Sequence, residues 1–148
     1  MAMNRIQFQP GLSMPDFVAR YGTAAQCEAA LVEARWPDGF RCPCCGSSAH
    51  CVVRAGSHQR FQCNACRLQI SLIAGTVFQG TKFRLTIWFL ALYLISQAKT
   101  GLSALALKRQ LGVSYPTAWL IQHKVMNAMA QREGRYLLEG PVQVDDAC

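Results

Sequence analysis

The spacing of the cysteines constrains this chain more than any other feature of its sequence. Six of its eight cysteines lie within the stretch RCPCCGSSAHCVVRAGSHQRFQCNACR, which covers residues 41–67. Cys42 and Cys45 form one Cys-x-x-Cys pair. Cys63 and Cys66 form a second pair, 17 residues after the first. This separation is typical of a tetrahedral zinc site, because each short turn presents two thiolates to one ion.

A disulfide framework is the main alternative for so many cysteines. The N-terminal sequence MAMNRIQFQPGLSMPDF has neither the apolar run nor the cleavage pattern of a signal peptide. We therefore expect a reducing, cytoplasmic environment, in which disulfides are rare. On this interpretation one structural zinc ion has four ligands, which are Cys42, Cys45, Cys63 and Cys66.

Four more potential ligands lie in the same stretch: Cys44, Cys51, His50 and His58. A turn from Cys42 to Cys44 has one intervening residue and is too short to span an edge of a tetrahedron. The longer turn to Cys45 is followed by Gly46, which can close it with a positive φ. We interpret Cys44 as a bystander, and the sequence leaves open whether any of these four contributes to metal binding.

Strand and helix signals surround the cysteines. Residues 51–54 and 60–62 are predicted strands joined by AGSHQ, and LQISLIAGT predicts a further strand that ends at Gly75. Upstream, Thr23 is predicted to cap a helix, AAQCEAALVEARW, with Cys27 in the core and the acids Glu28 and Glu33 mostly outside it.

The segment from residue 81 onward has a helical pattern. Leu85–Ser96 is nearly all apolar, but its 12 residues are fewer than the roughly 20 that span a bilayer, so we predict a core helix. A short helix capped by Ser103 and closed by Gly112, then a longer one capped by Ser114, predict a helix-turn-helix. The longer helix should pack through the side formed by Ala118, Val125 and Met129, with Ile121 and Met126 at its edges.

The charge distribution indicates a polyanionic partner. The chain has a net charge of +7, and from Gly39 to Arg132 it has eleven Lys and Arg but no Asp or Glu. Solvated faces normally mix both signs. A basic surface without a ligand is the alternative, and charge alone does not distinguish DNA from RNA or from an acidic membrane.

A DNA-binding helix-turn-helix would place specific residues at the interface. The N-terminal part of its second helix reaches base edges, so the candidates there are Ser114, Tyr115, Thr117 and Lys124. Lys108 and Arg109, on the first helix, suit phosphates. The alternative is a plain helical core with a solvated polar face, and His123 is interpreted as a surface or packing residue.

Four segments together carry a resemblance to a known family. They are RWPDGFRCPCCG, FQCNACR, AGTVFQGTKFRLTIWFLALYLI and KTGLSALALKRQLGVSYPTAWLIQHKVMNAM, in this order. From about Ala24 to its end, the chain resembles the N-terminal region of bacterial insertion-sequence transposases. In that family a zinc ribbon precedes a DDE catalytic domain with an RNase H-like fold.

The motifs and the resemblance divide the chain into four parts. These are an N-terminal helical segment (1–40), a zinc ribbon (41–80), a helix-turn-helix DNA-binding domain (81–135) and the start of a truncated catalytic domain (136–148). The expected fold class is α+β, with a zinc ribbon, a β-hairpin carrying two cysteine knuckles, flanked by an N-terminal helix and a C-terminal helix-turn-helix.

The resemblance also implies a function. It suggests that the chain is the DNA-binding portion of a transposase, recognises transposon-end DNA in the bacterial cytoplasm and nucleoid, and associates with copies of itself or with intact transposase. No membrane partner is expected. A stand-alone zinc-ribbon and helix-turn-helix transcriptional regulator is the alternative. The sequence indicates neither the target DNA sequence nor the oligomeric state.

Asp145, in the C-terminal VQVDDAC, matches the first catalytic acid of the family. Such sites bind two divalent ions through several carboxylates, so Mg²⁺ is expected only in a complete catalytic domain. We therefore predict that the 148-residue chain alone neither nicks nor joins labelled transposon-end DNA in Mg²⁺ or Mn²⁺. Cleavage that disappears in an Asp145→Ala variant would contradict this prediction.

Overall fold

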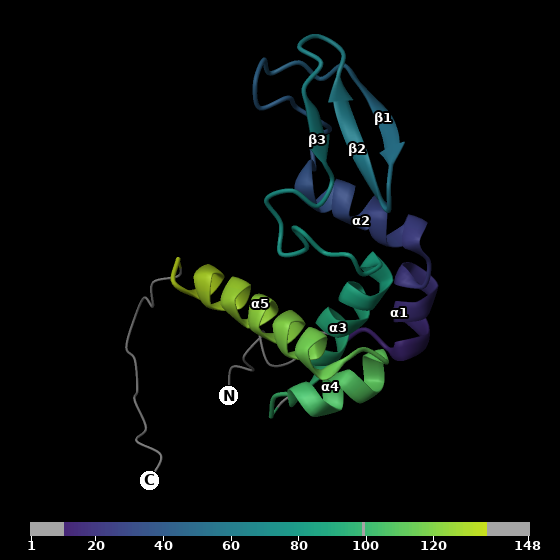
Figure 1. The fold of residues 1–148 in the computed structure, drawn as a ribbon, viewed down its shortest axis with the longest axis vertical. Helices are drawn as coiled ribbons and strands as arrows, with labels where there is room; N and C mark the ends of the chain where they lie inside the picture. Colours follow the sequence, from purple (N-terminus) through teal and green to yellow (C-terminus); the bar gives the residue numbers. More distant parts are fainter. Residues whose placement is uncertain (1–10, 99, 136–148) are drawn as a thin grey trace, which may run out of the picture.

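A computed structural model describes residues 11–98 and 100–135 of the chain. A small sheet lies at one end of the molecule, and most of the helices lie at the other, with α2 between them (Figure 1). The described residues form three strands and five helices. In chain order these are α1 (Met14–Tyr21), α2 (Ala24–Arg35), β1 (His50–Ala55), β2 (His58–Cys63), β3 (Gln69–Ser71), α3 (Leu85–Gln97), α4 (Ala104–Leu111) and α5 (Tyr115–Glu133). The predicted α+β class is confirmed.

The sheet is antiparallel, with the strand order β1-β2-β3. The predicted hairpin is present, with Val52 opposite Phe61 and with Gly56 in the turn at φ +81°. The third strand also joins the sheet as predicted, but it ends at Ser71 rather than at Gly75. Leu72 and Ile73 are both buried, and a strand would direct two consecutive side chains to opposite faces. The chain therefore leaves the sheet and continues in turns.

Helix α2 begins where its cap predicts. The Thr23 hydroxyl accepts from the backbone N–H of Gln26, and the Gln26 side chain accepts from the backbone N–H of Thr23, which forms a capping box. Cys27 is fully buried, as predicted. The prediction for Glu28 was wrong, because it is only 7% exposed. Glu28 lies beside His58 at the start of β2 and Leu85 at the start of α3, and its carboxylate lies 3.9 Å from the Arg54 guanidinium of β1.

Helix α1 was not recognised in the sequence. Ser13 is its N-cap and accepts a hydrogen bond from the N–H of Asp16, and Pro15 lies in its first turn. The ring of Phe17 stacks on Tyr93 of α3 with 4.5 Å between centroids. With eight residues, the helix is too short for the apolar periodicity to stand out.

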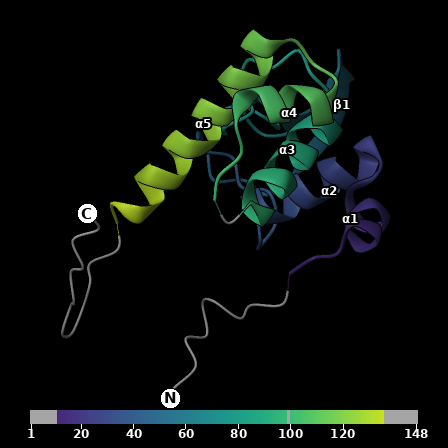
Figure 2. The same cartoon turned by 90° about the horizontal axis from the view of Figure 1, so that it is seen from below.

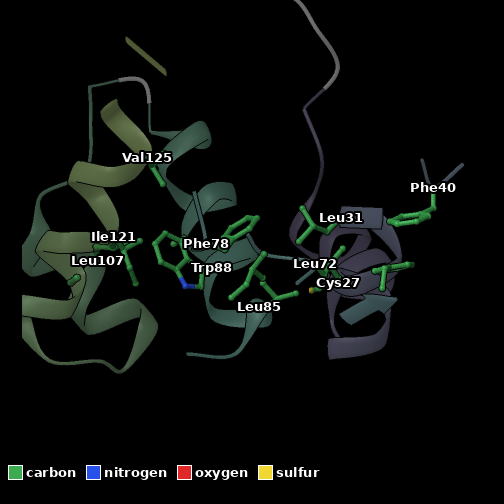
Figure 3. Packing of buried hydrophobic residues seen from close by; sticks show 14 of the residues in the cluster. Cys27, Leu31, Phe40, Leu72, Phe78, Leu85, Trp88, Leu107, Ile121 and Val125 are labelled. Atoms are coloured by element: carbon green, nitrogen blue, oxygen red, sulfur yellow. The ribbon is translucent and has the colours of Figure 1, made fainter. Parts of the chain in front are cut away.

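Helix α3 is the centre of the core. Figure 3 shows Phe78, Leu85 and Trp88 between side chains of α4 and α5 on one side and side chains of α2 and the ribbon on the other. Trp88 is 2% exposed, and its indole N–H donates to the Thr81 hydroxyl at 2.8 Å. The core-helix prediction is therefore confirmed. Within the described ranges, no helix combines the length and apolar character needed to cross a membrane.

Helices α4 and α5 are joined by the turn of residues 112–114. Ser103 caps α4 by accepting from the N–H of Ala106, and Gly112 ends it in the left-handed conformation at φ 68°. Ser114 occupies the N-cap position of α5 as predicted, but its hydroxyl bonds to the Thr117 hydroxyl at 2.9 Å instead of capping the backbone.

The packing side of α5 is shorter than predicted. Ala118, Ile121 and Val125 are buried, whereas Met126 and Met129 are 53% and 51% exposed. Figure 2 shows why, because the C-terminal end of this 19-residue helix extends away from the other helices. Met129 was predicted to lie within the packing side and Met126 at its edge, and neither prediction holds.

Replacement of Trp88 tests the central position of α3. We expect Trp88→Ala to lower the free energy of unfolding by about 3–5 kcal/mol, because it leaves a cavity beneath α5. Trp88→Phe should cost less, since it keeps most of the ring and removes the hydrogen bond to Thr81. Denaturant unfolding of the zinc-loaded protein measures both. Equal, small losses in the two variants would contradict this account of the core.

Candidate metal centre and nucleic-acid interface

Two turns of the same kind present the paired cysteines. In the first, the N–H of Gly46 donates to the carbonyl of Cys42 at 2.9 Å, and Gly46 has a φ of 72°. In the second, the N–H of Arg67 donates to the carbonyl of Cys63 at 3.0 Å, and Arg67 has a φ of 63°. The left-handed conformation costs a residue other than glycine about 1 kcal/mol. The second turn thus accepts strain at Arg67 to reach the geometry that Gly46 gives the first.

The turns bring four sulfur atoms together. The Sγ atoms of the four predicted ligands all lie within 4.8 Å of one another, and they belong to Cys42, Cys45, Cys63 and Cys66. The separation is 3.5 Å between Cys42 and Cys66 and also between Cys45 and Cys63. Zinc–sulfur bonds of about 2.3 Å in a tetrahedron place sulfurs about 3.8 Å apart. The donor set and its spacing therefore fit one tetrahedral zinc ion.

The protein environment shifts the pKa of all four thiols, and the shifts are largest for Cys63 and Cys66. Hydrogen bonds from the backbone N–H groups of Cys66 and Ala65 lower the pKa of Cys63 to about 6. For Cys66, the N–H of Leu68 lowers the pKa, but the neighbouring thiols and burial outweigh it and raise the pKa to about 12. One thiol is thus prepared for ionisation while another holds its proton, so a bound cation would displace a proton from Cys66 at neutral pH.

An aromatic cluster belongs to the same buried core as Cys42 and Cys63. The Phe40 and Phe61 rings stack with 5.6 Å between centroids, and Trp36 contacts both rings edge-on at 5.1 and 4.8 Å. Phe40 and Phe61 are buried. The ribbon therefore has an apolar core in addition to its metal site, and Trp36 connects that core to the end of α2.

The remaining candidate ligands lie outside the group of four sulfurs. Cys44 and Cys51 are exposed. The His50 ring packs against Phe40, with its Nδ1 atom 2.9 Å from the Ser48 carbonyl. The Nε2 atom of His58 is buried without a hydrogen-bond partner.

The predicted DNA contacts lie mainly around the turn between α4 and α5. Lys108 and Arg109 are exposed on α4, and Ser114 and Tyr115 are exposed at the start of α5. Thr117 is half-buried and bonds to Ser114.

Lys124 has a different environment from the other candidates. It is half-buried, and its Nζ atom donates to the Gln79 carbonyl at 3.3 Å and lies 5.9 Å from the centre of the Trp88 ring. Its cation is thus anchored to the segment that precedes α3.

Sequence reasoning missed an aromatic stripe on the outer side of α5. Tyr115 and Trp119 are each 48% exposed, and the Trp119 ring lies 3.9 Å from the ring of His123 between centroids. Tyr115, Trp119 and His123 follow one another at intervals of four positions, which places them on one side of a helix. This spacing of four was the sequence signal from which the stripe could have been predicted.

The exposed cations near α5 have few acidic neighbours. Within the described parts of the chain, the ion pair found is Arg54 of β1 with Glu28 of α2. Among the described residues, no carboxylate pairs with Lys82, Lys108 or Arg109. Asp145 lies outside the described residues.

Comparison with known proteins agrees with the geometry of the cysteine centre. Residues 22–69 match the family model of the transposase zinc-ribbon domain. Over 119 residues the chain is 34% identical to an uncharacterized protein in transposable element ISH50 of Halobacterium salinarum. The alignment covers 78% of this chain and 38% of that relative, so the chain spans well under half of the relative's length. No solved structure matches the chain.

The family model and the relative match parts of the chain that differ in length. The family model covers α2 and the ribbon, which is the part that carries the four sulfurs. The relative is encoded by a mobile element and extends the similarity beyond the ribbon. Residues 22–69 therefore belong to the transposase zinc-ribbon family, and the chain resembles the N-terminal region of an insertion-sequence transposase.

Proposed function

We propose that this chain binds the end DNA of an insertion sequence, as the DNA-recognising N-terminal portion of a transposase. The observation that carries the proposal is the set of cations around the turn between α4 and α5, which have no ion-pair partner among the described residues and lie in a stretch of chain without acids. Because the phosphate backbone dominates the affinity of such proteins, these cations supply the attraction. The similarity of the ribbon to transposase ribbons supplies the biological setting.

The two helices would divide the work of recognition. In a DNA-binding helix-turn-helix, the start of the second helix enters the major groove and the first helix crosses the backbone. Ser114 and Tyr115 are exposed at the start of α5, where they could meet base edges. Lys108 and Arg109, in the last turn of α4, would bind phosphates on either side.

The zinc ion would have a structural role. Four thiolates fill its coordination shell and leave no position for water or substrate, which is the pattern of structural sites. The ion would fix the two turns relative to the hairpin and so hold the ribbon as an auxiliary DNA contact. DNA strand transfer would belong to a whole transposase, in which Asp145 would be one of several carboxylates that bind Mg²⁺.

Zinc content tests the metal site. We predict one zinc per chain, unchanged in Cys44→Ser and reduced in Cys63→Ser, because only the second change removes a ligand. Elemental analysis of the purified proteins gives the stoichiometry. Circular dichroism after treatment with a chelator should show loss of the hairpin, since metal-binding energy stabilises the folded ribbon. Equal zinc loss in both variants would refute the assignment of ligands.

Salt-dependent DNA binding tests the interface. We predict that Lys108→Ala weakens binding to all duplexes and reduces the slope of log K against log salt by about one unit, as expected for one lost phosphate contact. Arg20→Ala, at the exposed C-terminal end of α1, removes the same charge away from the interface and is the matched control. An affinity that does not change with salt would rule out the proposed function.

A further inference from the structure

A groove adjoins the proposed interface but lies partly outside the two helices that form it. One wall is the segment before α3, residues 80–83, and the other is α5. Its volume is about 180 Å³, and its lining includes Thr81, Lys82, Phe83, Thr117, Leu120 and Lys124. Nothing in the sequence pattern of α4 and α5 indicated that residues 80–83 would reach this position.

The wall formed by residues 80–83 is held firmly to the core. The Thr81 hydroxyl accepts the indole N–H of Trp88 at 2.8 Å and also the backbone N–H of Phe83 at 3.1 Å. Gly80 adopts a φ of 74° at the preceding turn. Lys124 ties the same segment to α5 through the Gln79 carbonyl at 3.3 Å. Contacts within the protein therefore fix the shape of the groove without a ligand.

The exposed surfaces of the groove are apolar, with a cation at the rim. Phe83 is 37% exposed and Leu120 is 49% exposed, from opposite walls. Lys82 is exposed beside Phe83, and within the described ranges it has no carboxylate partner. Thr117, one of the predicted base contacts, lines the same groove.

This combination suits one feature of DNA in particular. In the major groove, the C5-methyl group of thymine is the apolar group that a base pair presents, and apolar side chains read it. A phosphate of the same strand can pair with a nearby lysine. A helix that enters the major groove with Thr117 would bring Leu120, one turn later, to the neighbouring base pairs.

We propose that Phe83 and Leu120 form a receptor for a thymine methyl group and that Lys82 binds a phosphate beside it. This inference rests on the proposed DNA-binding function and extends the reading surface to a segment outside the helix-turn-helix. It also gives a reason to prefer DNA over RNA, because uracil lacks the methyl group and the major groove of A-form RNA is too narrow for side chains.

Methyl deletion in the DNA provides the test. Duplexes would first be selected from a random pool by the full chain loaded with zinc. Each thymine in the selected site would then be replaced by deoxyuridine, one position at a time. At one position we expect the wild-type affinity to fall about fourfold, the effect of one buried methyl group. In Phe83→Ala and Leu120→Ala, the same replacement should change affinity little.

Matched controls make the outcome specific. Val18→Ala, at a 57% exposed position of α1, should keep the fourfold methyl effect. Circular dichroism and zinc content establish that each variant is folded. If every replacement is neutral for the wild type, or if Phe83→Ala keeps the methyl effect, the receptor is refuted while DNA binding stands. Failure of the wild type to select any duplex would overturn both proposals.

Discussion

The mutual distance of four sulfur atoms determines the shape of the N-terminal half of this chain. Four sulfurs within 4.8 Å of one another cannot all ionise without repelling one another, and a bound divalent cation would offset that repulsion. The two turns that carry the sulfurs have the same backbone, although one uses Gly46 and the other forces Arg67 into a left-handed conformation. A strained residue persists only where its surroundings fix it. The metal site is the constraint that explains this strain.

The aromatic cluster transmits that constraint to the helices. Phe40 and Phe61 pack beneath the sulfurs, and Trp36 joins them to the end of α2. The Arg35 guanidinium then donates to the carbonyls of Ser71 and Leu72, where the chain leaves the sheet. From there the chain leads to Thr81 and Trp88, and so to the core beneath α5. Metal site, sheet and proposed DNA-binding helices are thus connected through packed groups.

Local signals in the sequence predicted much of this architecture. The cysteine spacing, the capping residues Thr23 and Ser103, and the terminating Gly112 act within a few residues of their position, so their effects could be recognised without a structure. From α2 onward, the order of elements followed from these signals, whereas α1 was missed. The group of four sulfurs was also predictable, because a hairpin between two Cys-x-x-Cys pairs brings the two pairs close together.

Features that depend on distant packing could not be predicted. Glu28 is buried beside the hairpin and the start of α3, which are distant from it in the sequence, and the exposure of Met129 depends on where the neighbouring helices end. Lys124 is held by the Gln79 carbonyl, 45 residues earlier in the chain, and the groove beside it arises from the same approach. Amphipathic patterns identify which side of a helix is apolar. They do not state how much of that side a neighbour covers.

The central claim is that zinc bound by four thiolates organises the ribbon. X-ray absorption spectroscopy at the zinc edge of the purified chain tests it most directly, because the spectrum reports the ligand atoms and their distances. The account predicts a single shell of four sulfurs at about 2.3 Å. A shell that contains nitrogen or oxygen at about 2.0–2.1 Å would contradict it, since a histidine or water would then replace one of the four cysteines.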